Sequence, residues 1–255
     1  MAPNDVKLIA TDLDDTILRR DNTVSDYAKS VFARCREKGI LIAFATARSQ
    51  TRTARIAEWI PPDILISDMG AIARQGAKVL YKATMPPDVV SELVQRVCND
   101  PQILQISIQS DGASFDSEPW EGNPHSVLTD FSKPVEFGDA YKFTIRTADS
   151  QLPGIIAADF PGIGMISFRD TDWHAFHALG ATKGNALLAV AAALGIPLGN
   201  IAAFGDDTSD IGMLRVAGIG VAMQNAIGEV KAAADCVCGD CDEDGAAHWI
   251  EENIL

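Results

Sequence analysis

Two acidic runs in the chain carry carboxylates at spacings that suit metal and phosphate chemistry. Asp12 and Asp14 lie in the run DLDDT directly after an apolar stretch, and the run GDDTSD begins at Gly205 after another apolar stretch. In open α/β sheets, ligands bind beyond the carboxyl ends of the strands. Clustered carboxylates repel one another unless a cation or a proton intervenes. Both runs therefore predict a cation site, with a solvated acidic turn as the alternative for the first run.

Two further positions offer groups that bind an oxyanion. Thr46 ends another apolar stretch and is followed by Ala47 and Arg48, which together supply a hydroxyl and backbone N–H groups. Lys183 is the only charged residue in a long neutral stretch and lies at the start of an expected helix, where a cation opposes the helix dipole. That position is reasonable if the lysine and the helix terminus both face an anion. With hard oxygen ligands for Mg²⁺ nearby, these groups predict a site of phosphoryl transfer.

The stretches before these groups have the pattern of buried strands in a parallel sheet. Four of them are almost continuously apolar, at residues 6–13, 40–46, 64–67 and 201–205. Ser25 is a suitable N-cap for a helix that Gly39 ends. Later helices and strands of the same pattern are expected at 185–194, 211–217, 220–223 and 235–238. This alternation predicts an α/β fold with a doubly wound, mainly parallel sheet.

The middle of the chain has a different pattern. Pro86 and Pro87 open an expected helix, and apolar and polar residues then alternate from 104 to 109, so that strand has one polar face. Further elements are expected at 142–146, 150–160, 165–168 and 173–178. Such strands predict a half-solvated, antiparallel sheet. We therefore expect an inserted α+β domain at 83–180, within a core made of 1–82 and 181–255.

Charge and composition limit the classes of partner. The chain has 21 basic and 35 acidic residues, a net charge of −14, and no basic cluster, which argues against nucleic acid and anionic membranes as partners. The uncharged run from Gly184 to Gly205 contains glycine and proline, so it predicts a buried helix, a turn and a buried strand rather than a membrane span. The first residues lack a secretory pattern, and five cysteines fit a reducing compartment. We expect a cytoplasmic monomer or homodimer.

The four groups, in this order, resemble the motifs of the haloacid dehalogenase (HAD) superfamily of phosphatases. They are DLDDT, TAR at 46–48, Lys183 and GDDTSD at 205–210. The helix that ends at Gly39 before LIAFATAR, and the run VAMQNA at 221–226, resemble its Cof-type subgroup. The resemblance spans the core and implies a HAD-like, Rossmannoid fold with an α/β cap inserted between the second and third motifs.

The resemblance also implies catalytic roles. Asp12 would attack phosphorus and form an aspartyl-phosphate. Asp14 would protonate the leaving oxygen and then deprotonate the attacking water. Thr46 would hydrogen-bond the phosphoryl group, and Lys183 would neutralise charge on Asp12 and the phosphate.

The same resemblance implies a Mg²⁺ site. The ion would lie on the carboxylates of Asp12 and Asp206 and on the backbone carbonyl of Asp14. Asp210 would support the metal shell through water or orient Lys183. Mg²⁺ is thus the expected cofactor.

Several other positions are weaker candidates for phosphate or substrate contacts. They are Ala47, Arg48, Ser209 and His177. Arg48 has the alternative of pairing with a core carboxylate, and His177 that of facing the interior. Ser209 and Met69 stand where the subgroup usually has asparagine, which bears on substrate and rate more than on reaction type. Cys236, Cys238 and Cys241 resemble a metal clip, but ordinary thiols are the favoured interpretation because no fourth soft ligand lies closer than His248.

The function expected is that of a Mg²⁺-dependent phosphatase of a small phosphorylated metabolite, with a sugar or polyol phosphate as the expected substrate, acting through an aspartyl-phosphate. One alternative is a phosphomutase or phosphotransferase that passes the same intermediate to a non-water acceptor. The other is a non-catalytic sugar-phosphate sensor or a receiver-like signalling module, although a receiver has no need of an inserted domain.

Overall fold

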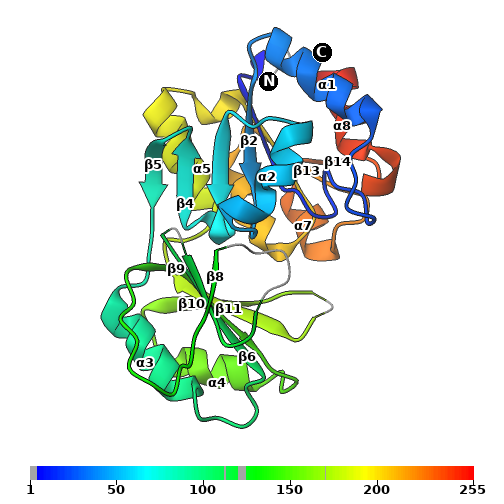
Figure 1. Ribbon diagram of the computed structural model, residues 1–255. Coiled ribbons are helices and arrows are strands. Elements are labelled where there is room, and N and C mark those ends of the chain that lie inside the picture. Colours follow the sequence, from blue (N-terminus) through cyan, green and yellow to red (C-terminus); the bar gives the residue numbers. More distant parts are fainter. Residues whose placement is uncertain (1–4, 112, 120–124, 170) are drawn as a thin grey trace. The chain divides into compact units, whose positions relative to one another are not determined.

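The computed structural model describes residues 5–111, 113–119, 125–169 and 171–255. It divides into two compact units (Figure 1). The first, here called the core unit, comprises Met1–Lys82 and Thr182–Leu255, and the second, the inserted unit, comprises Ala83–Ala181. Each unit has its own cluster of buried apolar side chains.

The core unit is built on one sheet whose described strands run in the order β14-β13-β12-β1-β2-β3-β4-β5. Their bounds are Leu8–Thr11 (β1), Leu41–Ala45 (β2), Ile64–Ser67 (β3), Ile72–Gln75 (β4), Lys78–Lys82 (β5), Ile201–Gly205 (β12), Ile219–Ala222 (β13) and Cys236–Val237 (β14). Pairing is parallel from β14 to β3 and antiparallel for β4 and β5. The expected doubly wound, mainly parallel sheet is therefore confirmed. Because parallel strands run in one direction, β1, β2 and β12 end at the same edge.

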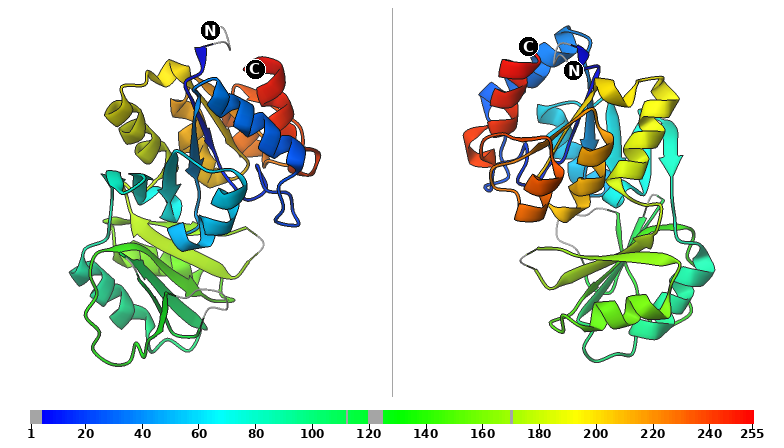
Figure 2. Two further views of the ribbon diagram at one scale, coloured as in Figure 1. Left: turned by 45° about the horizontal axis from the view of Figure 1, so that its top comes forward. Right: turned by 180° about the vertical axis from the view of Figure 1, so that it is seen from behind.

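Helices flank this sheet (Figure 2). They are Asp26–Glu37 (α1), Gln50–Trp59 (α2), Lys183–Leu194 (α5), Ile211–Val216 (α6), Gly228–Ala233 (α7) and Gly245–Asn253 (α8). The side chain of Ser25 accepts a hydrogen bond from the backbone N–H of Ala28, which confirms the expected cap of α1, and Gly39 follows that helix with a φ of 75°. In the part of the chain that the structure describes, no helix combines the length and the apolar character that crossing a membrane requires.

One expectation for the core unit is wrong. Helix α5 was expected to be buried, but Asn185, Leu188 and Ala192 are exposed, and only one of its faces is covered. The alanine-rich sequence gives this helix little amphipathic contrast. Small apolar residues on its outer face therefore have the same pattern as buried ones.

The inserted unit contains a second sheet, whose described strands run in the order β10-β11-β9-β6-β7-β8. Their bounds are Gln105–Ser110 (β6), Ala113–Asp116 (β7), Ser126–Leu128 (β8), Ala140–Arg146 (β9), Ile163–Ser167 (β10) and Trp173–Ala178 (β11). Pairing is antiparallel except between β7 and β8. Helices Pro87–Val97 (α3) and Leu152–Asp159 (α4) pack on one face of this sheet (Figure 1).

The other face of this second sheet is less solvated than the alternating pattern predicted. Ser107 and Ser114 are buried there with Asp116, whose carboxylate accepts hydrogen bonds from both hydroxyls at 2.5 and 2.6 Å and from Ser126 at 2.5 Å. A buried carboxylate needs such partners to offset its lost hydration. The alternation of residue types identified the strand, but the polar side chains are satisfied by one another rather than by water.

Candidate active site

Three carboxylates meet where neighbouring strands of the core sheet end. Asp12 follows β1, and Asp206 and Asp210 follow β12, which pairs with β1 in parallel. One carboxylate oxygen of each lies within 4.8 Å of the others, and all three residues are buried. The two acidic runs singled out in the sequence are therefore brought to one place. Carboxylate oxygens at this spacing fit a small hard cation such as Mg²⁺.

Lys183 supplies the positive charge in this cluster. Its ammonium lies 2.8 Å from Oδ1 of Asp12 and 2.6 Å from Oδ1 of Asp210, and the residue is 1% exposed. It is the first residue of α5, after Thr182, whose side chain accepts from the N–H of Asn185. The helix start thus directs the lysine at the acidic cluster, as its unusual place in the sequence suggested.

Both oxygens of the Asp210 carboxylate have protein partners. Its Oδ1 accepts from Lys183, and its Oδ2 accepts from the backbone N–H groups of Asp206 and Asp207, both at 3.0 Å. Of its two implied roles, orienting Lys183 is the one whose contacts are in place. Gly205 makes room for this side chain, because a Cβ there would lie 2.4 Å from Cβ of Asp210.

The electrostatics of the cluster favour a further cation. Burial raises the pKa of Asp12 well above its usual value, and although Lys183 opposes this, Asp210 and Asp206 raise it further. Burial would lower the pKa of Lys183, but the charges of Asp12 and Asp210 outweigh it, so that pKa lies above its usual value. The cluster thus holds three carboxylates and one ammonium, and a divalent ion would balance the remaining charge. The hydroxyl of Thr16 already donates to Oδ1 of Asp206, which orients that carboxylate.

The carboxylate of Asp14 is directed elsewhere. Nε of Arg48 donates to its Oδ2 at 2.9 Å, and Nη2 of Arg48 donates to its Oδ1 at 2.5 Å. The Asp14 side chain is 48% exposed. The structure therefore places the Arg48 guanidinium on a core carboxylate, the alternative to a phosphate contact that the sequence left open.

The loop after β2 is braced by the turn after β3. Thr46 is fully buried and its Oγ1 accepts from the N–H of Arg48, which leaves the hydroxyl proton free to donate. The N–H groups of Asp68 and Met69 donate to the carbonyls of Arg48 and Thr46 at 2.9 and 3.1 Å. Ala47, which lies between Thr46 and Arg48 in the sequence, is half-buried. These contacts hold the backbone N–H groups of the loop in one conformation.

The same turn contains two residues that sequence reasoning missed. Asp68, Met69 and Gly70 have φ angles of 52°, 65° and 95°, a run that non-glycine residues rarely adopt. A Cβ on Gly70 would lie 2.2 Å from the carbonyl carbon of Thr182, so this glycine lets the turn approach the start of α5. Met69 attracted notice only as a departure from a family pattern. Neither Asp68 nor Gly70 carried a signal that a single sequence reveals.

The remaining candidates lie apart from these contacts. Ser209 is half-buried in the short helix Thr208–Asp210 that follows β12. His177 belongs to β11 of the inserted unit, where its Nδ1 lies 2.9 Å from the carbonyl oxygen of Ala178 and burial lowers its pKa. His174, on the same strand, is buried against Ser167.

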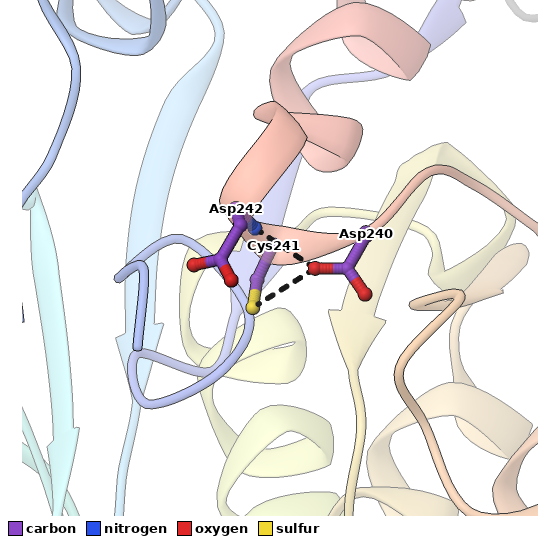
Figure 3. Close-up of side chains that lie close together, drawn as sticks. All are labelled: Asp240, Cys241 and Asp242. Carbon is purple, nitrogen blue, oxygen red and sulfur yellow. Dashed lines mark hydrogen bonds between the residues drawn. The ribbon is translucent and has the colours of Figure 1, made fainter. Parts of the chain in front are cut away.

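The cysteine-rich segment does not gather soft ligands. Cys241 instead lies between Asp240 and Asp242 (Figure 3), and Arg20 forms ion pairs with both of these carboxylates. Burial raises the pKa of the Cys241 thiol to about 12, so it stays protonated at neutral pH. The His248 ring of α8 packs at a tilt against the Tyr27 ring of α1, and all five cysteines are free thiols.

The chain is similar to several known proteins. A family model described as haloacid dehalogenase-like hydrolase matches residues 9–250. The 5-amino-6-(5-phospho-D-ribitylamino)uracil phosphatase YcsE of Bacillus subtilis is 26% identical over 260 residues, 96% of each chain. The HMP-PP phosphatase of Cronobacter sakazakii is 26% identical over 96% of this chain and 94% of its own. A solved sugar phosphatase of HAD subclass IIB has a TM-score of 0.83 at 23% identity, over 97% of this chain and 98% of its own.

The chain belongs to the haloacid dehalogenase-like hydrolases, because the family model spans nearly its whole length. Within that family it is an enzyme of the phosphatase type, in keeping with relatives that are named phosphatases. The likeness to the solved structure shows that the fold is shared across both units. The family that the four motifs indicated is thereby confirmed.

Proposed function

We propose that the protein is a Mg²⁺-dependent, cytoplasmic phosphatase of a small sugar or polyol phosphate, and that it works through an aspartyl-phosphate on Asp12. The observation that carries this proposal is the buried contact of Asp12 with Lys183 beside two further carboxylates. A carboxylate that only stabilised the fold would gain little from such crowding, because burying charges costs more than most ion pairs return. Crowding is expected, however, where a carboxylate must attack a phosphoryl group.

In the first step, an oxygen of Asp12 attacks phosphorus and the bond to the leaving oxygen breaks, with Asp14 giving that oxygen a proton. Lys183 and the Thr46 hydroxyl stabilise the transferring phosphoryl group, together with the N–H groups of the loop that contains Ala47. In the second step, Asp14 takes a proton from water, which attacks phosphorus and releases phosphate and the free carboxylate.

The residues present fit a Mg²⁺ ion. Asp12 and Asp206 would hold it through carboxylate oxygens and Asp14 through its backbone carbonyl. Asp210 would orient Lys183, whose ammonium donates to its Oδ1. When bound, the ion supplies positive charge that offsets the charge of the phosphoryl group. The short side chain of Ser209 would contact the phosphoryl group, or a water on the metal, through a bridging water.

The proposed substrate class rests on the substrates for which similar proteins are named. One is named for a phosphoribityl substrate, another for HMP-PP, and a third is called a sugar phosphatase. We propose that the inserted unit, expected over 83–180, selects the leaving group, and that His177 is its candidate contact. A mutase or phosphotransferase remains the alternative, because it would share the same intermediate.

The test is a screen of phosphorylated metabolites with Mg²⁺, reading kcat/KM and released phosphate for each. We expect the highest values among sugar and polyol phosphates and no activity with excess chelator. Turnover that requires a bisphosphate activator would identify a mutase. Binding without any turnover across the whole screen would identify a sensor.

A further inference from the structure

The Arg48 guanidinium grips both oxygens of the Asp14 carboxylate. The two hydrogen bonds, Nε to Oδ2 at 2.9 Å and Nη2 to Oδ1 at 2.5 Å, form the parallel fork in which guanidinium and carboxylate groups match. A single contact would let the carboxylate rotate, whereas a fork fixes both its direction and its plane. This matters because the Asp14 side chain is half-exposed.

Arg48 is itself fixed from three sides. Its Nη2 also donates to Oδ1 of Asn22 at 3.0 Å. Its backbone N–H donates to Oγ1 of Thr46 at 3.1 Å, and its carbonyl accepts from the N–H of Asp68 at 2.9 Å. Segments that follow β1, β2 and β3 thus converge on one arginine. An arginine held in one position in turn fixes the orientation of the carboxylate that it binds.

We propose that Arg48 is a positioning residue for Asp14 and not a ligand of the phosphoryl group, an inference that rests on the proposed function because Asp14 is there the acid and base. Each carboxylate oxygen has two lone pairs, so the fork leaves one on each oxygen for the leaving group and for water. Arg48 then contributes to proton transfer only. A phosphate ligand in its place would contribute to the binding of every phosphate ester.

The two roles differ in which substrates they affect. A general acid matters for an alkyl leaving group and little for an aryl leaving group, which departs unprotonated. Arg48→Lys keeps the charge but loses the fork. We expect the single-turnover rate of the first step, read as release of the leaving group, to fall by about 10-fold or more on a sugar phosphate and by less than about 3-fold on p-nitrophenyl phosphate, since general acids contribute about 10² to 10⁴. The second step needs Asp14 as a base after either substrate, so steady-state kcat should fall on both. The inhibition constant of inorganic phosphate should stay unchanged.

Three further variants sharpen the test. Asn22→Ala, which frees one arm of Arg48, should change the two substrates in the same unequal way but by less. In an Asp14→Asn background, Arg48→Lys should have no further effect on the sugar phosphate, because two residues that act through one another are not additive. Arg55→Lys is the matched control, because Arg55 lies in helix α2, which follows Arg48, and its guanidinium lies over the Trp59 ring; this variant should behave as the wild type.

Equal losses of the first-step rate on both substrates with a raised inhibition constant for phosphate, or full additivity with Asp14→Asn, would overturn the proposal and make Arg48 a phosphate ligand. If Arg48→Lys does not fold, as circular dichroism would show, the same comparison with Asn22→Ala decides. Failure of the proposed function looks different, since the wild type itself would then hydrolyse neither substrate.

Discussion

Lys183 has a buried ammonium whose position depends on two carboxylates, Asp12 and Asp210. Removing one partner of such a buried group leaves an uncompensated charge, which costs about 3–5 kcal/mol. Asp210 binds the lysine and the backbone N–H groups of residues 206 and 207, while Asp12 is the carboxylate that we propose as the nucleophile. Asp206, which accepts a hydrogen bond from the Thr16 hydroxyl, is the neighbouring carboxylate that we propose as a metal ligand.

Asp206→Ala should therefore act on metal dependence more than on folding. We expect the Mg²⁺ concentration for half-maximal activity to rise by about 10-fold or more, in the range that loss of a metal-shell contact costs. KM for the substrate at saturating Mg²⁺ should change little. Asp207→Asn removes the neighbouring charge, which lies outside the cluster, and serves as the control. Equal Mg²⁺ dependence in both variants would remove Asp206 from the metal site.

At the level of elements, the turn Asp68–Gly70 connects the loop after β2 with the start of α5. It donates two backbone hydrogen bonds to the loop that contains Thr46 and Arg48, and Gly70 contacts the backbone of Thr182. The loop after β2 and the start of α5, which carries Lys183, are thus placed by one short segment. A change in this segment should be felt at both.

Gly70→Ala tests that connection. A Cβ there would overlap the Thr182 backbone, so we expect about 2–4 kcal/mol lost from the free energy of unfolding and a lower kcat as Lys183 is displaced. Gly76→Ala is the matched control, because Gly76 also has a positive φ, 56°, but nothing lies within 4 Å of its added Cβ. That variant should lose only about 1 kcal/mol and keep its kcat. Urea denaturation gives both values, and similar losses in the two variants would refute the close approach.

Strand β11 should contribute a pH dependence to stability. Burial lowers the pKa of His174 below its usual 6.5, so as the pH falls the unfolded chain binds this proton before the folded chain does. The folded state therefore loses stability below about pH 6.5. His174→Gln should make the urea midpoint fall less between pH 7.5 and 5.5 than it does in the wild type. Parallel curves would show that His174 has the same pKa in both states.

Across the whole molecule, the sequence predicts best those elements whose pattern lies within one short segment. Strands buried on both faces, such as β3 and β12, were expected with the bounds that the structure has, because continuous apolar runs mark them. Helix α2 escaped notice because it buries only Thr53 and Ile56, and the edge strand β5 because it is largely exposed. Neither segment has a strong periodicity of apolar residues.

The candidate site divides in the same way. The motifs at strand ends could be found because type and spacing are local, and the parallel sheet brings them together. The Arg48–Asp14 fork joins residues 34 positions apart, and the contact of Gly70 with Thr182 spans more than 100. Such pairs depend on where two segments meet in three dimensions, which no local pattern records.

The central claim, that Asp12 becomes phosphorylated, is tested most directly by trapping the intermediate. Asp14→Asn should accept phosphate from p-nitrophenyl phosphate but release it slowly, because the base for water is missing. Rapid acid quenching and mass analysis of the peptides should then find about one phosphoryl group per active site, on Asp12, matching a burst of nitrophenol. Asp12→Asn should show neither signal while keeping its fold. Nitrophenol release without any phosphoryl group on Asp12 would contradict the account.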